Sequence, residues 1–365
     1  MELLQQDYDI VAFGTPATPA DRSSITLPIC ELRSSQVPYP CTGREIFAPF
    51  RVHLHDLEDE LAAFDLVFTV DTYYELSRQA IEAKRRHGCR VVVLQSDNIP
   101  FNFGGTGENH IHATVRDEAD HFVAIADATR RALLLEGVPE RKVTTVPWGI
   151  DLAEFRNPSP SFRDEFRRRC GLPPDAFTIL YTGRLVWTKG VFHLLYAAKL
   201  LLSDPELRNA NVHVLLVGDG NERPELEAQA RALGIENRIH FAGSLPLGDV
   251  PIAYSVANAF ALPSIATSTT QEQFGQVLIE AMASGLPVIG STCGAIPDVI
   301  AGAGVVVPQS DYVSLAHVLK RLALDSNWRR ELGAAARTRV AAEFEIHAVA
   351  AKLKTVFEHV LPHSP

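Results

Sequence analysis

The sequence predicts an α/β protein built from two doubly wound parallel-sheet domains. Short, continuously apolar segments alternate with helical segments along most of the chain, as expected for parallel strands that helices cover on both faces. With 365 residues, of which 46% are hydrophobic, the chain is long enough for two domains that each bury a core. A proline- and serine-rich segment, 157–161, separates the two halves and is the best candidate for a linker.

In the first half the alternation is clear from residue 65 onward. Before it, the apolar segment 10–13 is a predicted buried strand that ends at Gly14, where the chain turns. Residues 21–60 contain four prolines and scattered charges, and we predict irregular connections there. The later strands are predicted at 66–70, 91–94, 122–125 and 143–146, and the helices at 73–87 and 128–136.

The second half repeats the pattern after a short basic helix at 162–170. Its predicted helix at 191–202 has apolar residues at offsets of 0, 3, 4, 7, 10 and 11, which form a stripe that faces a core. The remaining strands are predicted at 178–181, 212–217, 239–241, 257–262 and 287–290, and the remaining helices from about 224, from about 275 to 285, and at 312–324, 327–344 and 347–360. The predicted domains are therefore 1–157 and 158–345, followed by a terminal helical segment, 346–365.

Charge and cysteine content limit the function classes. The formal net charge is −10, and residues 1–150 hold 14 Lys and Arg against 22 Asp and Glu, a difference of −8. This acidity argues against binding of nucleic acid or of an anionic membrane, and we expect any membrane association to be at most peripheral. No run reaches the ~18–20 apolar residues of a membrane span, and the start of the chain has no basic segment. Five scattered cysteines without a CxxC pair favour reduced thiols, and we expect a cytoplasmic protein without signal peptide or anchor.

Two glutamates flank the predicted start of a helix in the stretch from Glu272 to Glu280. Glu272 lies in the loop, whereas Glu280 lies about 8 Å further along the helix axis at 1.5 Å per residue, too far for a close acid–base pair. Between them, the free N–H groups of Phe274, Gly275 and Gln276 lie at the positive end of the helix dipole, which favours a phosphate. Taken alone, two glutamates at this spacing are more often ordinary helix charges. A nucleotide sugar, with a diphosphate between two groups that carry hydroxyls, nevertheless fits the arrangement.

A second stretch carries two cations at another predicted strand-to-helix junction, Gly183-Arg184-Leu185-Val186-Trp187-Thr188-Lys189-Gly190. A guanidinium binds two phosphate oxygens as a fork and an ammonium acts as a point charge, so Arg184 and Lys189 both suit a diphosphate. Either cation alone would be read as a solvated loop charge. A third turn, Gly218-Asp219-Gly220, follows the strand at 212–217 and resembles a dinucleotide-binding turn only weakly.

Together the two stretches resemble the retaining nucleotide-sugar glycosyltransferases of family 4, with Glu272 and Glu280 at that family's two spaced glutamates. The resemblance implies the GT-B fold, in which two Rossmann-like domains face a central cleft and the terminal helix crosses back to the first domain. It also implies that the first domain binds the acceptor and that the second binds the nucleotide sugar.

The resemblance implies roles for individual residues as well. Arg184 and Lys189 stabilise the leaving phosphate, with help from the N–H groups at the helix start. Glu272 contacts hydroxyls of the sugar, and Glu280 accepts hydrogen bonds from the ribose. Three glycines at the ends of predicted strands are further candidates for contact with the donor: Gly14, Gly183 and Gly218. Gly14 can equally be a turn glycine.

The chain departs from the family pattern at several positions. A histidine that faces the donor sugar in many members falls on Ser96 here, and the neighbouring Asp97 is our candidate for contacting sugar hydroxyls, with an Asx turn as an equally good explanation. Thr188 stands where glutamate is usual. No DxD pair sits where it could hold a metal on the diphosphate, so we expect catalysis without a metal or another cofactor. Three histidines are spaced too loosely for a metal site and are predicted to lie on the surface: His110, His112 and His121.

We therefore predict a retaining, metal-independent glycosyltransferase that moves a hexosyl group from a UDP- or GDP-linked sugar to a hydroxyl acceptor. The acceptor would be a growing glycan, as in polysaccharide biosynthesis, or a small glycoside, and residues 14–30 and 95–112 would recognise it. Two alternatives stay open: a nucleotide-sugar 2-epimerase, and a nucleotide-sugar-binding protein that has lost catalysis. The sequence leaves the base, the hexose, the linkage and the oligomeric state undetermined.

Overall fold

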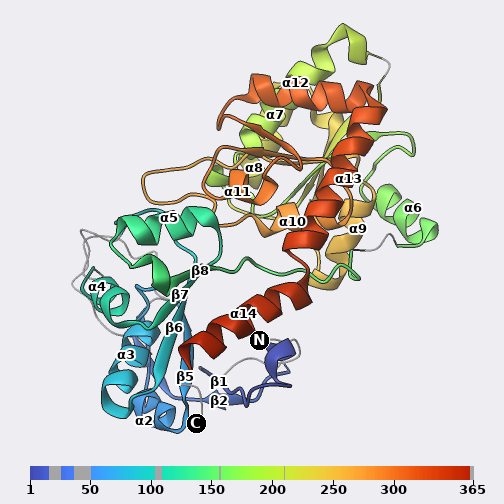
Figure 1. Ribbon diagram of the computed structural model, residues 1–365. Coiled ribbons are helices and arrows are strands. Elements are labelled where there is room, and N and C mark those ends of the chain that lie inside the picture. Colours follow the sequence, from blue (N-terminus) through green and yellow to red (C-terminus); the bar gives the residue numbers. More distant parts are fainter. Residues whose placement is uncertain (16–25, 37–50, 103–108, 156–157, 209, 362–365) are drawn as a thin grey trace. The chain divides into compact units, whose positions relative to one another are not determined.

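The computed structural model describes residues 1–15, 26–36, 51–102, 109–155, 158–208 and 210–361 (Figure 1). The chain divides into two compact units, Met1–Pro147 together with His347–Pro365, and Trp148–Ile346. The first boundary thus falls before the predicted position 157. Near this boundary the backbone N–H of Ile150 donates to the carbonyl oxygen of Phe344, and the N–H of Ile346 donates to the carbonyl oxygen of Ile150. The two segments of chain that connect the units are therefore hydrogen-bonded to each other inside the second unit. Each unit is an α/β domain with a parallel sheet, as the sequence predicted.

The main sheet of the first unit consists of four parallel strands in the order β5-β6-β7-β8. Its strands are β5 (Leu66–Val70), β6 (Arg90–Gln95), β7 (His121–Ala124) and β8 (Val143–Thr145), and the helices between them are α3 (Glu75–His87), α4 (Asn109–Glu118) and α5 (Asp127–Leu135). The interior of this sheet is apolar, and Val91, Val93 and Phe122 are completely buried. Because the strands are parallel, their carboxyl ends lie at one edge, where open α/β sheets bind ligands.

Four short strands of the first unit lie outside this sheet: β1 (Ala12–Gly14), β2 (Ile29–Glu31), β3 (Ser34–Gln36) and β4 (Val52–Leu54). β1 pairs with β2 in parallel, and β3 pairs with β4 in antiparallel orientation. The buried strand predicted at 10–13 is thus shifted to later residues and is only half-buried. The prediction of irregular connections over 21–60 missed β2, β3, β4 and the short helix α2 (Leu57–Glu60). Elements of three or four residues are too short to show a periodic pattern in the sequence.

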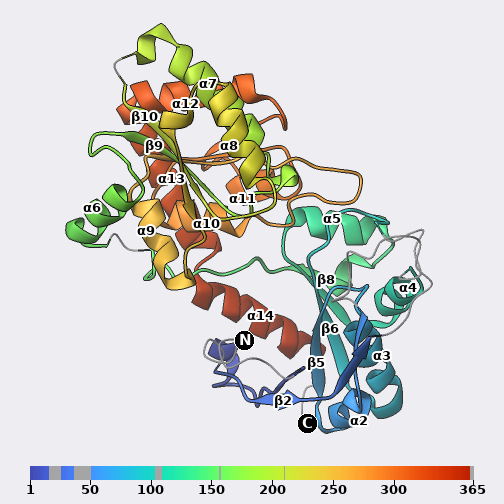
Figure 2. The same cartoon turned by 180° about the vertical axis from the view of Figure 1, so that it is seen from behind.

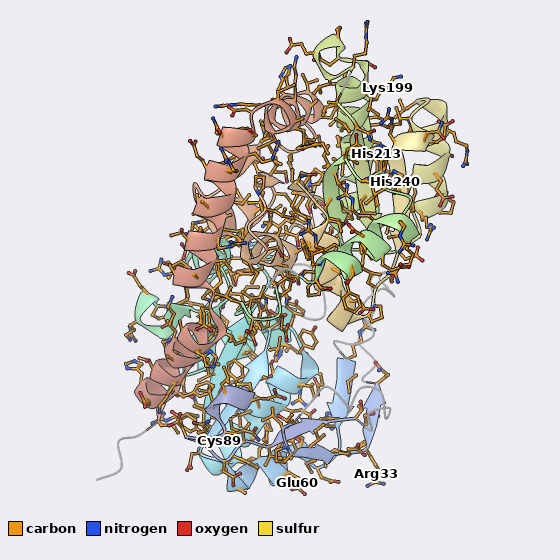
Figure 3. The ribbon with its side chains drawn as sticks, turned by 90° about the vertical axis from the view of Figure 1, so that its right-hand side faces the viewer. Arg33, Glu60, Cys89, Lys199, His213 and His240 are labelled. Atoms are coloured by element: carbon orange, nitrogen blue, oxygen red, sulfur yellow. The ribbon has the colours of Figure 1, made fainter. Side chains whose placement is uncertain are left out.

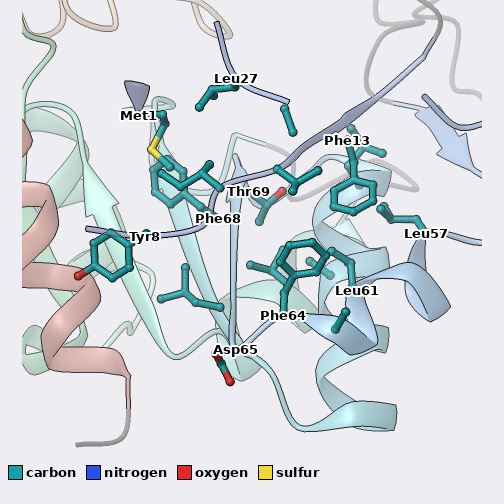
Figure 4. A pocket seen from close by; sticks show the side chains of 18 of the residues that line it. Met1, Tyr8, Phe13, Leu27, Leu57, Leu61, Phe64, Asp65, Phe68 and Thr69 are labelled. Carbon is teal, nitrogen blue, oxygen red and sulfur yellow. The ribbon is translucent and has the colours of Figure 1, made fainter. Parts of the chain in front are cut away.

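A cavity of about 810 Å³ lies within the first unit and is lined by residues of both β1 and β5 (Figure 4). Its wall is mainly apolar, and Phe13 meets Phe64 there edge to face with ring centroids 5.5 Å apart. Among the described residues β5 pairs only with β6, so β1 does not extend the main sheet.

The last helix, α14 (Ile346–Val360), packs on the first unit. Phe357 is buried and meets Phe68 of β5 and Tyr8 edge to face, with centroids 5.4 and 5.9 Å apart. Lys354 forms an ion pair with Asp7. The predicted return of the terminal helix to the first domain is therefore confirmed.

In its described residues the second unit contains a sheet of six parallel strands in the order β11-β10-β9-β12-β13-β14. These strands are β9 (Phe177–Thr182), β10 (Val212–Val217), β11 (Ile239–Gly243), β12 (Ala259–Leu262), β13 (Val288–Ser291) and β14 (Val305–Val307). Strands β10 and β11 lie on one side of β9, and the chain then crosses to the other side of β9 for β12. The strand order therefore reverses between β9 and β12, and such a topological switch opens a crevice at the carboxyl edge of the sheet.

The helices of the second unit form two groups that cover the sheet (Figures 1 and 2). The first group is α7 (Val191–Ser203), α8 (Arg223–Ala232) and α12 (Tyr312–Leu324), and the second is α6 (Pro160–Arg169), α9 (Val250–Ser255), α10 (Gln276–Ala283) and α13 (Ser326–Glu343), while α11 (Ile296–Ile300) adjoins β13. On α7 the predicted apolar stripe faces the core, since Leu194, Leu195 and Leu201 are buried.

The surface prediction for the histidines is wrong for two of the three. His112 on α4 and His121 on β7 are 7% and 4% exposed, whereas His110 is exposed. Each buried ring has a hydrogen-bond partner, as buried polar groups usually do. His112 Nδ1 lies 2.6 Å from Thr72 Oγ1, and His121 Nε2 lies 2.9 Å from Thr144 Oγ1. Burial lowers the pKa of His121 to about 4, so that this ring is neutral at pH 7.

A second histidine pair lies near the amino ends of β10 and β11 (Figure 3). His213 Nδ1 and His240 Nε2 are 2.8 Å apart, and Arg238 approaches the other nitrogen of His213 at 3.0 Å. Burial, followed by the electrostatic effects of His240 and Arg238, lowers the pKa of His213 to about 4, and burial also lowers the pKa of His240. Both rings are thus uncharged structural groups, and they lie at the sheet edge opposite to the topological switch.

Two further predictions from composition concern thiols and membrane segments. The described cysteines, Cys30, Cys89, Cys170 and Cys293, are free, as expected, and Cys41 lies outside the described residues. None of the helices within the described residues combines the length and the apolar character needed to cross a bilayer.

Candidate functional site

Loops from four strands meet at the carboxyl edge of the second sheet, around the switch between β9 and β12. The loop after β9 contacts the loop after β12, since a Cβ atom at Gly190 would lie 1.9 Å from the carbonyl oxygen of Pro263. It also contacts the loop after β10, since a Cβ atom at Gly218 would lie 2.0 Å from the carbonyl oxygen of Gly183. The φ angles of Gly190, Gly218 and Gly183 are +67°, +129° and +139°, a backbone conformation that favours glycine at all three. At Gly190 and Gly218 the close approach of the neighbouring loop also excludes a Cβ atom.

The loop after β13 closes the group. The backbone N–H of Ala295 donates to the carbonyl oxygen of Glu272 at 2.9 Å, and a Cβ atom at Gly294 would lie 2.0 Å from the same oxygen. The backbone that carries Glu272 is therefore fixed from one side by the loop after β13.

Lys189 and Glu272 form an ion pair that joins the two loops flanking the switch. Lys189 Nζ lies 2.9 and 2.7 Å from the two carboxylate oxygens of Glu272, and Ser264 Oγ donates to one of these oxygens at 2.7 Å. The side chains are 21% and 10% exposed, so this charged pair is largely shielded from water but still accessible. Because an ammonium has three donors, Lys189 can bind a further anionic ligand while it holds Glu272.

Arg184 precedes Lys189 on the same loop and is exposed. Its backbone is anchored, because the hydroxyl of the fully buried Tyr181 donates to the carbonyl oxygen of Arg184 at 2.7 Å. Burial, with the nearby Glu272 carboxylate, raises the pKa of Tyr181, which keeps this donor protonated. The fold thus fixes the backbone of Arg184 and leaves its guanidinium at the surface of the sheet edge.

The start of α10 lies beside this ion pair. Gly275 is the N-cap with φ +84°, and a Cβ atom there would lie 3.6 Å from Cγ of Glu272. The N–H groups of Gln276 and Val277, the first two of the helix, have no partner within it. The ring of Phe274 is 4% exposed and packs against Phe344, with ring centroids 5.8 Å apart. Only the backbone of Phe274 can therefore face a ligand.

Glu280 lies inside α10 and is held by a buried hydroxyl pair. Its Oε2 accepts a hydrogen bond of 2.6 Å from the hydroxyl of Tyr254, which lies 2.7 Å from Thr182 Oγ1. Burial raises the pKa of Glu280, and the hydrogen bond from Tyr254 partly offsets this effect. The carboxylate is thus oriented by the core and keeps a second oxygen for another donor.

In the first unit, Asp97 follows β6 at the carboxyl edge of the sheet. Its carboxylate accepts from the backbone N–H of Ile99 at 3.2 Å and from the side chain of Asn102 at 3.1 Å, so the Asx turn considered for this residue is present. Burial, with smaller effects of Asp71 and another nearby carboxylate, raises the pKa of Asp97 to about 6. Its neighbour Ser96 donates to Asp71 from both its backbone and its hydroxyl, at 2.6 and 2.8 Å.

Gly14 ends β1 in the first unit. A Cβ atom at this position would meet no atom within 4 Å, and its φ angle is not left-handed. The backbone there does not require glycine, and a donor contact by Gly14 stays a prediction. Of the segments predicted to recognise the acceptor, 16–25 and 103–108 lie outside the described residues.

Comparison with known proteins assigns the chain to a family. Residues 162–339 match the family described as glycosyl transferases group 1, and residues 2–154 match glycosyltransferase family 4. The chain belongs to glycosyltransferase family 4. Curated relatives include D-inositol 3-phosphate glycosyltransferases of Thermomonospora curvata and Thermobifida fusca, both 32% identical over 73% and 75% of this chain. The chain spans 65% and 64% of the length of these two proteins.

Solved structures show the same fold as this family 4 chain. The HepE protein of Anabaena, in complex with UDP and glucose, is 20% identical with a TM-score of 0.76, and the match covers 95% of this chain and 90% of that one. Sucrose-phosphate synthase of Thermosynechococcus elongatus is 22% identical with a TM-score of 0.78, covering 99% and 91%. The predicted GT-B fold is therefore confirmed.

In this family 4 chain the structure brings together most of the residues that sequence reasoning selected in the second half. Lys189, Glu272, Gly275 and Gln276 adjoin, and the glycines Gly183 and Gly218 hold the loops on which they depend. Sequence reasoning missed the residues that orient the charged groups. These residues are Ser264, Tyr254, Thr182 and Tyr181. Only Ser264 had a signal in the sequence, because it follows Pro263 in a turn-like pair.

Proposed function

We propose that the chain is a retaining glycosyltransferase whose second unit binds a nucleoside diphosphate hexose, UDP- or GDP-linked, at the carboxyl edge of its sheet. The observation that carries the proposal is the Lys189–Glu272 pair, which joins the loops on both sides of the topological switch next to the first N–H groups of α10. Parallel α/β sheets bind nucleotides at such a point, and helix starts bind phosphate.

Each polar group at this edge then has a role that its chemistry permits. Lys189, the exposed guanidinium of Arg184 and the N–H of Gln276 hold the diphosphate. Glu272 keeps Lys189 in place and accepts from hexose hydroxyls with its remaining lone pairs. Glu280, oriented by Tyr254, accepts from the ribose hydroxyls.

The reaction forms one bond and breaks one at C1 of the hexose. The oxygen of the acceptor hydroxyl bonds to C1 on the face from which the phosphate departs, so the anomeric configuration is retained. The C1–O bond to the β-phosphate breaks, the nucleoside diphosphate leaves, and its phosphate oxygen takes the proton of the acceptor. Lys189 and Arg184 stabilise the negative charge that grows on the leaving group, so the step proceeds without a divalent metal.

The first unit also carries a group that can bind a sugar. With a pKa of about 6, Asp97 is ionised at pH 7 and can accept a hydrogen bond from a hexose hydroxyl. The acceptor is a hydroxyl of a glycan or a small glycoside. The name of the curated relatives adds inositol 3-phosphate to the candidates.

A transfer assay with labelled UDP-glucose, UDP-galactose, UDP-N-acetylglucosamine and GDP-mannose, in the presence of EDTA, tests the proposal. We expect one donor to raise Tm and to be converted to nucleoside diphosphate and an α-linked product; a ligand at 100 times its Kd stabilises by roughly 2.7 kcal/mol. Inversion at C2 without transfer would identify an epimerase instead. A raised Tm without any turnover would identify a binding protein, and no effect of any donor would contradict the proposal.

A further inference from the structure

Phe101 has a backbone conformation that its residue type rarely adopts. Its φ angle is +59°, in the left-handed region, where a non-glycine residue costs about 1–3 kcal/mol. Its side chain gains nothing from burial in return, because it is 60% exposed. Phe101 lies four positions after Asp97, in the loop at the carboxyl edge of the first sheet. A strained backbone that presents an aromatic ring to solvent at a ligand-binding edge is typical of a recognition residue.

Buried polar groups hold Phe101 in this conformation. Its N–H donates to Oε1 of Glu136 at 2.7 Å, and Oε2 of Glu136 lies 3.0 Å from His112 Nε2. The other ring nitrogen of His112 lies 2.6 Å from Thr72 Oγ1. The side chains of Glu136 and His112 are only 6% and 8% exposed. The position of the exposed Phe101 is thus fixed by Glu136 at the end of α5, which is held by His112 on α4 and, through it, by Thr72 in the loop after β5.

The charge around this loop is negative. Asp71, Asp97 and Glu136 converge on it, and the first and last of them contribute to the raised pKa of Asp97. Of the two cations on α5, Arg130 pairs with Glu140, and Arg131 also has an interaction within the chain. A phosphate would bring a further negative charge next to these carboxylates, whereas a hydroxyl of a neutral sugar can donate to Asp97, which is only partly buried.

From this geometry we infer that Phe101 packs against the ring of a neutral sugar acceptor, and that the surrounding carboxylates disfavour a phosphorylated one. The inference rests on the proposed transferase function and specifies its acceptor class. The C–H face of a pyranose or cyclitol ring supplies the apolar surface that an exposed aromatic ring can cover. The partly exposed carboxylate of Asp97 can then accept from a hydroxyl at the rim of that sugar.

Replacement of Phe101 by glycine separates recognition from stability. Glycine adopts a φ of +59° without strain, so we expect Tm not to fall in Phe101→Gly. The KM for the acceptor should rise about three- to tenfold, while donor KM and donor hydrolysis stay unchanged. Asp56→Gly, at another left-handed residue of the first unit (φ +68°), and Phe162→Ala, at another exposed phenylalanine, should leave acceptor KM unchanged. An unchanged acceptor KM in Phe101→Gly would overturn the inference.

Matched acceptors test the charge argument on the unsubstituted protein. The pairs are myo-inositol with D-inositol 3-phosphate, and methyl glucoside and methyl mannoside with their 6-phosphates, each offered with the donor found in the transfer assay. We expect the neutral member of a pair to be used with the higher kcat/KM. Preference for a phosphorylated member, or transfer to no neutral sugar although a donor is hydrolysed, would overturn this inference alone. Failure of every donor to bind would overturn the proposed function and this inference with it.

Discussion

Lys189→Ala is expected to lower kcat about 10²- to 10³-fold with a much smaller change in the KM for the nucleotide sugar. The ammonium is proposed to meet negative charge that grows on the leaving phosphate, and a contact that strengthens in the transition state acts mainly on kcat. The loop that carries it is fixed by the bond from Tyr181 and by the packing of Gly190, so neighbouring side chains cannot replace it. Steady-state kinetics with the preferred donor measure both constants.

Two control variants separate chemistry from structural damage. Loss of Lys189 leaves the largely buried Glu272 with Ser264 and without its cation, which should cost about 1–3 kcal/mol of unfolding free energy. The double variant Lys189→Ala, Glu272→Gln removes the charge of Glu272 as well, so it should recover stability but not kcat. Glu280→Ala should instead raise the donor KM with less effect on kcat, because Glu280 is assigned to the ribose. A kcat for Lys189→Ala near that of the unsubstituted protein would refute the role of Lys189.

Gly190→Ala is expected to be the most damaging single-methyl substitution at the site. The new Cβ atom would lie 1.9 Å from the carbonyl oxygen of Pro263, so the loops after β9 and β12 would have to separate. This clash adds to the ~1–2 kcal/mol that a left-handed backbone costs any residue with a Cβ atom, and the total should be about 4 kcal/mol or more. Denaturant unfolding measures the loss, and donor binding should fall because Lys189 moves away from Glu272.

Gly234→Ala is the matched control for that experiment. Gly234 has nearly the same φ angle, +65° against +67°, but a Cβ atom there would meet nothing within 4 Å. It should therefore show the backbone cost alone, about 1–2 kcal/mol, with normal donor binding. Equal losses in the two variants would mean that the contact between the two loops does not constrain the site.

Most strands and helices around the two sheets were predictable because they are long and periodic, whereas α4, α9, α11 and β14 were missed. Burial can be predicted from the apolar stripe on α7 and from the continuous apolar residues of β9, β10 and β12. Gly275 indicates where α10 begins. The charged residues of the second unit were predictable for a related reason. Lys189 and Glu272 each follow a recognisable strand, and parallel strands bring such positions to one edge.

Groups that act through distant partners were not predictable. Tyr254 lies on a six-residue helix and reaches Glu280 only through the fold, and the burial of Phe274 depends on Phe344, seventy positions later in the sequence. Asp97 was selected for its position, but its Asx turn and raised pKa depend on Asn102 and on burial. The left-handed backbone of Phe101 is set by Glu136, and no local pattern indicates it.

Hydrogen–deuterium exchange with saturating UDP or GDP, whichever raises Tm more, tests most directly whether the edge of the second sheet holds the diphosphate. The proposed function predicts slower exchange at residues 183–190 and 263–275 and at the N–H groups of Gln276 and Val277, while the strand ends that carry His213 and His240 are unaffected. Unchanged exchange at these loops, or protection confined to other parts of the chain, would contradict it.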